Sequence, residues 1–477
     1  MSVFRPLGGR QLSRREFLRY YGIASSALTF SPFFLERMSA VCAAAANLAR
    51  VYKVKNAPTS NPDDIGYVTQ TINQLWAMLD GPAKFISPSD IVVIKCNGQW
   101  PNQGSTHTGC LKAVIDQILA IPGFSGEVLI CDNVQQFGVA GQTGFDSTPA
   151  YRVNNWSQFN WTQLAQSYRS ETTPQPVAVY QWQSDTNWRN PTLPLPSTSL
   201  WTPAMGIPSG ATTLWSRYFF LYNGNPTYLS YPVFESPLTP GRIIDMKNGV
   251  WEGGSYTGRR VKTIVMPTLN NHDWTGGSED YAGVTSAVKS FFGATEIYHG
   301  TAGTDPNYIW NGYYGLHPAS FANSSDPQGA YYAGQLVGQF INNLYSPVLY
   351  ITTAIYSGWF NRWAADGAAF TNTVLACTNP VSLDYVSCRD VISKAGSTPP
   401  TFLDPSTQNN NTWLQLLGCN SQGIGAVDPS QMDIITYDFN HPTATRLDIE
   451  RKIRDYKAGN ATQQDVKDVI SLYMSNG

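Results

Sequence analysis

Apolar and polar positions alternate in blocks along the chain, and the first clear blocks form one α/β unit. A continuous apolar run at 91–94 is typical of a strand buried on both faces of a sheet. A polar loop at 96–108 follows, and apolar side chains then recur at helical spacing from 111 to 118. A second apolar run at 128–130 ends at Asp132. Because strands joined by a crossover helix lie parallel, this pattern predicts a parallel sheet.

The same alternation returns in the second half of the chain. The stretch 259–267 predicts a strand, a polar loop follows it, and 282–293 predicts a helix that carries Lys289. The stretch 346–358 predicts another strand. The stretch 371–396 predicts a strand, a tight loop and a helix that begins near a proline, which favours the first helical turn.

Between and after these blocks the pattern changes. From about 145 to 258 tryptophans and prolines are frequent, and short alternating pieces such as 212–224 predict strands with turns. We interpret this region as a large irregular or antiparallel insertion, whose length suggests a lid, a binding surface or a partner contact. The two amphipathic stretches after residue 445 predict a C-terminal helical hairpin. The segment 438–448 before them resembles a calcium loop, but Pro442 replaces an acidic ligand, which favours a hairpin without metal.

The N-terminus predicts export. Paired Arg14 and Arg15, followed by a short apolar stretch and small residues at 43–46, resemble a twin-arginine signal with its cleavage site. The alternative is an ordinary amphipathic helix. We therefore expect a signal peptide at 1–46, an α/β domain at 47–430, and the hairpin region at 431–477. The expected location is the periplasm or another exported site, reached through the twin-arginine machinery, with no membrane span after signal removal.

Composition and charge narrow the partners. The formal net charge of −2 gives no field that would attract nucleic acid or an anionic membrane. Seven cysteines occur without any C-x-x-C pair, so we expect no iron–sulfur cluster and no zinc ribbon. An exported location permits disulfides, and the sequence leaves open whether one forms. No other cofactor is indicated by a motif, although the twin-arginine route often carries proteins with one already inserted.

Candidate chemistry gathers where the predicted strands end. In parallel sheets the loops at the carboxyl ends of the strands form the ligand crevice. Lysine, imidazole and carboxylate groups that meet there can hold a small anion or move protons. We assign His107, His272 and Lys289 as candidate catalytic residues, and assign as candidate substrate-binding residues Lys95, Asn97, Thr106, Asp132 and Asp384.

Each assignment has a structural alternative. Lys95 could cap carbonyls at the strand end, and His107 could begin a helix and bond to nearby backbone. Asp132 could cap the next loop. Asp384 could pair with Arg389 or cap a helix.

A metal site and a sugar site are further alternatives. His107 and His272 could bind a metal with Asp132 or Asp273, but no close ligand spacing supports this, and we assign no metal ligand. The insertion tryptophans could stack on sugars, although tryptophan more often fills a core. Neither a G-x-S-x-G elbow nor a phosphate-binding P-loop occurs.

The order of these motifs resembles the domain-of-unknown-function 362 family. The segments that carry the resemblance are VIKCN and STHTG, then PTLNNH and GVTSAVKSFFG, and later CTNPVSLD. Thr268 and Asn270 stand where the family has lysines, Ser290 and Asn379 where it has asparagine and aspartate, and Thr353 where an aspartate is expected. The resemblance implies a fold and a pocket more than a reaction.

Two functions follow as hypotheses. The first is an exported enzyme or redox-associated protein that acts on an anionic ligand. The second is a non-catalytic binding or assembly protein that uses the tryptophan-rich insertion as a partner surface.

Overall fold

A computed structural model of the chain describes residues 48–475, apart from residues 135–138, 152, 155, 157, 170–175, 183–199, 208–212, 223–224, 273–282, 296–326, 359–366 and 443–444. The expected signal at 1–46 lies outside the described residues, as do Asp273 and Trp188. The fold class is α/β, as the sequence predicts, with a mostly parallel main sheet, flanking helices, an antiparallel second sheet and a C-terminal pair of helices.

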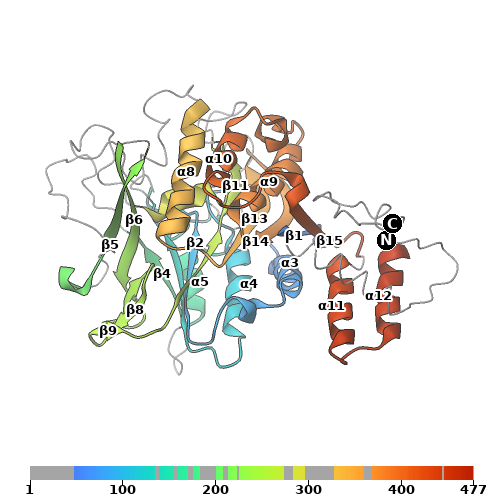
Figure 1. Ribbon diagram of the computed structural model, residues 1–477, viewed down its shortest axis with the longest axis horizontal. Coiled ribbons are helices and arrows are strands. Elements are labelled where there is room, and N and C mark those ends of the chain that lie inside the picture. The colour runs from blue at the N-terminus through green and yellow to red at the C-terminus, as the bar shows by residue number, and fades with distance from the viewer. Residues whose placement is uncertain are drawn as a thin grey trace, which may run out of the picture.

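The main sheet runs across the centre of the molecule (Figure 1). Every neighbouring pair along its main path is parallel except the pairs made by β14, which lies antiparallel to both neighbours. Its strands, in spatial order, are β15 (Met432–Asp438), β1 (Ala49–Lys55), β14 (Ala368–Cys377), β13 (Leu349–Gly358), β10 (Val261–Met266), β2 (Ile91–Cys96), β3 (Glu127–Asp132) and β4 (Val177–Gln181), with β11 (Thr268–Asn271) and β12 (Val284–Thr285) attached beside β13.

Helices cover both faces of this sheet, and the central strands are apolar because both of their faces are buried. One face packs against α3 (Ile65–Met78), α4 (Thr108–Leu119) and α5 (Trp161–Ser167). The other face packs against α8 (Pro327–Asn343), α9 (Pro380–Asp390) and α10 (Asn411–Asn420). The layers of helix, sheet and helix are visible in Figure 1.

Short 3₁₀ turns connect these elements. They are η1 (Pro82–Lys84), η2 (Pro203–Met205), η3 (Lys289–Ala294), η5 (Ile392–Lys394), η6 (Thr401–Leu403), η7 (Pro405–Thr407) and η8 (Pro429–Gln431).

The second sheet lies within the expected insertion and is entirely antiparallel. Glu127, the first residue of β3, ties it to the main sheet by accepting a hydrogen bond from Ser236 at 2.6 Å and by pairing with Arg242. Its strands are β5 (Thr213–Tyr222), β6 (Asn225–Glu235), β7 (Ile243–Asp245), β8 (Gly249–Glu252) and β9 (Ser255–Tyr256).

Two boundaries differ from the sequence expectation. Strand β4 lies inside the range expected for the insertion, yet it pairs in parallel with β3 and extends the main sheet. Strand β15 lies inside the range expected for the hairpin, yet it pairs with β1 over residues 49–55. In both cases the pairing joins segments far apart in sequence, which local apolar patterns do not reveal.

The C-terminal hairpin consists of α11 (Arg446–Lys457) and α12 (Gln463–Ser475), which stand at one end of the molecule in Figure 1. Thr445 and Asp448 form a capping box that starts α11. Two ion pairs attach these helices to the main domain. Arg50 lies 2.9 Å from Glu450, and Arg451 lies 2.8 Å from Asp80. The six cysteines that the structure describes are buried and are not joined by disulfides.

The segment expected to be a helix at 282–293 has a different structure. Val284 and Thr285 form β12 against β11, and the 3₁₀ helix η3 begins only at Lys289. Two β-branched residues favour the extended pairing, so too few residues remain for a regular helix before Gly293 and Ala294 end the segment.

Candidate functional site

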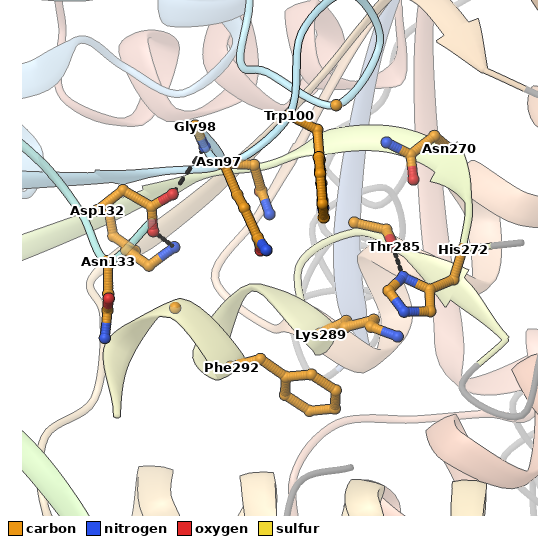
Figure 2. Close-up of a pocket in the computed structure, with 14 residues that line it drawn as sticks. Asn97, Gly98, Trp100, Asp132, Asn133, Asn270, His272, Thr285, Lys289 and Phe292 are labelled. Carbon is orange, nitrogen blue, oxygen red and sulfur yellow. Dashed lines mark hydrogen bonds and ion pairs between the residues drawn. The ribbon is translucent and has the colours of Figure 1, made fainter. Parts of the chain in front are cut away.

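A small cavity opens where β2, β3 and β11 end, and η3 forms its other side (Figure 2). Its volume is about 60 Å³, which is room for a few water molecules or one small ligand. It lies at the carboxyl edge of the parallel strands, as expected for a ligand crevice in this fold class. The residues that line it are Lys95, Asn97, Gly98, Gln99, Trp100, Gly104, Asp132, Asn133, Asn270, His272, Thr285, Lys289, Phe292 and Gly293.

A buried ion pair forms one wall of the cavity. Lys95 Nζ lies 2.7 Å from Asp132 Oδ1, and both side chains are less than 5% exposed. The amino group also donates to the carbonyl of Cys96 and to Ser290 Oγ at 3.4 Å, so three protein oxygens surround it. Burial raises the pKa of Asp132, while Lys95 and the N–H of Gly98, 2.7 Å from Oδ2, oppose that rise. Lys95 therefore holds Asp132 in place more than it offers a free charge to a ligand.

Gly293 allows this ion pair to be covered. A Cβ at this position would lie 2.4 Å from Asp132 Oδ1 and 2.8 Å from Lys95 Nζ, distances that no real side chain tolerates. The backbone carbonyl of Gly293 also accepts from the N–H of Asn133 at 3.3 Å. The absence of a side chain lets η3 close over the end of β3.

Thr106 lies behind the cavity wall and not in its lining. Its hydroxyl donates to the carbonyl of Met266 at 2.6 Å and accepts from the N–H of Asn97 at 2.9 Å. Trp161 Nε1 donates to the Thr106 carbonyl at 3.2 Å. Thr106 thus joins the loop after β2 to the end of β10 and places Asn97 in the lining.

His107 is also outside the cavity lining. It is fully buried, caps α4 by accepting from the N–H of Cys110 at 3.3 Å, and stacks on Trp156 with ring centroids 5.1 Å apart. Burial lowers the pKa of His107 to about 3, so its ring is neutral at ordinary pH. These contacts are those of the helix-start alternative, and His107 does not line the cavity that His272 lines.

His272 lies in the lining, just after β11. Its Nδ1 is 3.1 Å from Thr285 Oγ1, and the ring faces the cavity in Figure 2. Thr285 is the partner of Asn270 in the β11–β12 pair. This hydrogen bond fixes the orientation of the ring within the cavity lining.

Lys289 lies in the lining at the start of η3. It is 4% exposed, and its ammonium group lies 5.0 Å from the centre of the Phe292 ring.

Asp384, which lies outside the lining, holds the segment that leads to Lys289. Its carboxylate accepts from the N–H of Ala287 at 2.9 Å and of Val288 at 2.8 Å. Burial raises the pKa of Asp384 to about 7, although these N–H groups favour its charged form. Asp384 therefore positions the start of η3 and does not touch a ligand in the cavity.

The structure thus brings five of the eight candidate residues into one cavity. These are Lys95, Asn97, Asp132, His272 and Lys289.

Sequence reasoning missed several other lining residues. Trp100 and Phe292 supply aromatic walls, and Asn133 and Thr285 supply polar groups. A strand-end position was the available signal for Asn133, which follows β3 directly. Trp100 and Phe292 carry no such signal, because an aromatic residue in a loop or near a helix usually fills a core.

The described lining contains two lysines and one carboxylate. Lys95 pairs with Asp132, and Lys289 is the second lysine. Across the part of the chain that the structure describes, no three His, Cys, Asp or Glu side chains gather as a metal ion requires. None of the helices in the described ranges is long and apolar enough to span a membrane.

Comparison of the chain with protein-family models, curated proteins and solved structures found no match.

Proposed function

We propose that this chain is an exported protein that binds a small organic anion in the cavity at the carboxyl edge of its main sheet. The observation that carries the proposal is the joint lining of one buried site by Lys289, His272 and the Lys95–Asp132 pair. In a buried site of low effective dielectric, a lysine attracts an anion more strongly than it does at a surface.

The chemistry proposed for the site is proton exchange with the bound anion. Lys289 supplies the charge, and Asn97 and the backbone near Gly98 orient the ligand. His272, fixed by Thr285, then accepts or donates a proton through Nε2. This arrangement suits an enzyme or redox-associated protein that changes the protonation of its ligand.

Export and family membership belong to the same proposal. They are supported by the Arg14–Arg15 pair with its apolar stretch, and by the order of the motifs around Lys95 and His272. Attaching residues 1–46 to a reporter, with and without replacement of both arginines by lysine, tests export. Reporter that stays in the cytoplasm in both cases would contradict it.

Binding of acetate, glycolate, phosphate and sulfate to the full chain, measured by calorimetry, tests the site. Replacing Lys289 with Met should weaken the binding of the best anion by at least about tenfold, because a buried charge-assisted contact contributes about 1.5–3 kcal/mol. His272→Gln should alter the pH profile of binding with little change in Tm. Lys394→Met, at a lysine that is 65% exposed, is the control and should bind normally. Equal binding by the Lys289 variant, or no binding of any anion, would overturn the proposal.

The insertion tryptophans give the assembly alternative little support. Trp156, Trp161, Trp182 and Trp201 are at most 2% exposed and fill the core, whereas Trp215 and Trp251 are partly buried against it. The anion-binding function is preferred because charged and polar side chains line one cavity.

A further inference from the structure

Asn270 presents a hydrogen-bond acceptor to the cavity. The residue is 1% exposed, and its Nδ2 donates to the backbone carbonyl of Gln103 at 3.0 Å. A carbonyl can only accept, so this contact fixes which end of the amide is nitrogen. The opposite atom, Oδ1, is therefore an acceptor, and Figure 2 shows it on the cavity side of the residue.

Within the described part of the chain, Asn270 Oδ1 is buried and has no hydrogen-bond donor. A buried amide oxygen without a donor is unfavourable, because it has lost its hydrogen bonds to water and gained none in the protein. A donor on a bound ligand would remove that cost. The cavity therefore favours a ligand that carries a hydrogen-bond donor for Asn270.

We infer that the ligand of this cavity is a small hydroxy acid, whose carboxylate meets Lys289 and whose hydroxyl donates to Asn270 Oδ1. This inference rests on the proposed anion-binding function and names its ligand class. An amino acid fits less well, because its ammonium group would add a second positive charge beside Lys289. Sulfate fits less well because it carries no proton at neutral pH. Hydrogen phosphate has a donor but no carbon, whereas Trp100 and Phe292 give the cavity apolar walls that suit a carbon skeleton.

Calorimetric titration of the full chain with matched ligands tests this inference. Glycolate has the hydroxyl, acetate lacks it, and methoxyacetate keeps the oxygen but has a methyl group in place of the donated proton. Glycolate should bind at least about tenfold more tightly than either analogue, since a site with a buried polar group discriminates against a ligand that leaves it unpaired. Glycine and phosphate should both bind more weakly than glycolate.

Two variants separate the role of Oδ1 from that of the Gln103 contact. Asn270→Leu removes the acceptor and should abolish the preference for glycolate over acetate. Thr268→Val removes the other side-chain donor to the Gln103 carbonyl, at 2.7 Å, and should preserve the glycolate preference. Tm of each variant confirms folding, and if Asn270→Leu fails to fold, the ligand series on the native chain decides.

The outcomes distinguish this inference from the function on which it rests. If glycolate, acetate and methoxyacetate bind equally, and their binding requires Lys289, the hydroxy-acid inference is wrong and anion binding stands. Tighter binding of glycine or phosphate than of glycolate also overturns the inference. If no anion in the series binds, the proposed function itself fails.

Discussion

At the scale of single residues, the strongest constraint on the site is the buried pair of Lys95 and Asp132. Two charges withdrawn from water are stable only when each has close partners, and removing one partner of such a pair typically costs about 3–5 kcal/mol. Here the pair also receives the N–H of Gly98 and is covered by Gly293. The site is therefore sensitive to a single methyl group placed at position 293.

Gly293→Ala should weaken binding of small anions at least about tenfold and lower the free energy of unfolding by about 1–3 kcal/mol, because the new Cβ overlaps Asp132 and Lys95. Calorimetry and denaturant unfolding measure the two effects. Gly66→Ala makes the same chemical change in α3, away from the cavity, and should leave anion binding unchanged. Normal binding by the Gly293 variant would show that the ion pair does not shape the cavity.

His107 should make the fold sensitive to acid. Its pKa is lowered by burial from 6.5 to about 3, so the unfolded chain binds a proton at pH values where the folded chain does not. The stability gained from the neutral ring is fully present above about pH 6.5 and is lost as the pH falls toward 3. His107→Asn keeps an N-cap acceptor for Cys110 but does not titrate.

The free energy of unfolding of native protein minus that of His107→Asn should therefore decrease as the pH falls from 7 to 4. Denaturant unfolding at several pH values measures this difference. A difference that stays constant with pH would contradict the neutral, buried ring.

For the candidate residues, the sequence predicted well which strand ends they occupy, but it did not predict what each side chain does there. Lys95, Asp132 and His272 could be predicted to meet because parallel strands end at one edge. Whether a side chain there faces the cavity depends on turns and helix caps that the apolar pattern does not determine. His107 therefore caps α4, although its type and position are those of a catalytic residue.

At the scale of elements, the segment from β12 to η3 carries Thr285, Lys289 and Phe292 into the site. It is short and irregular, so its own hydrogen bonds do not fix it, and Asp384 on α9 supplies two acceptors from outside. The sequence predicted a regular helix here because the spacing of apolar residues fits one. The pairing of β12 with β11 is a long-range effect that overrides that local preference.

Asp384→Asn should leave one of the N–H groups of Ala287 and Val288 without an acceptor and destabilise the fold by about 1–3 kcal/mol. The folded pKa of about 7 is above the unfolded value of 3.8, so the native contribution of Asp384 decreases as the pH rises from about 4 to 7. The stability difference between native protein and variant should decrease over the same range. Denaturant unfolding from pH 4 to 8 measures it.

Asp390→Asn, on the same helix, is the matched control. The contribution of Asp390 to stability should change with pH in the opposite direction. Hydrogen bonds and charge from Arg389 and Lys53 lower the pKa of Asp390 to about 2. Its contribution is therefore present above about pH 4 and lost as the pH falls further. If both variants show the same pH dependence, the assignment of a raised pKa to Asp384 is wrong.

At the scale of the whole molecule, the class of fold was predictable and its connections were not. Apolar runs predicted the central strands β2, β3, β10 and β13, because a strand that is buried on both faces has a continuous run of apolar residues. The pairing of β14 with β1, and the placement of β15 beside β1, depend on contacts between distant segments. No local pattern contains that information.

The two parts of the C-terminal region should differ in importance. A chain ending at residue 442 keeps β15 and loses α11 and α12, and it should still unfold cooperatively and bind anions, with a lower Tm. A chain ending at residue 427 also loses β15, which pairs with β1 over seven residues, and it should lose cooperative unfolding. Thermal unfolding followed by circular dichroism distinguishes them, and cooperative unfolding of the shorter chain would contradict this account.

The place of β1 between β14 and β15 also sets the time at which the molecule can fold. Residues 49–55 leave the ribosome early, but both of their neighbours in the sheet are synthesised more than 300 residues later. This side of the sheet is therefore completed only after residues 432–438 have been synthesised, and such distant pairing slows folding. Under the proposed twin-arginine route, which carries folded proteins, export would have to wait until the last strand is in place.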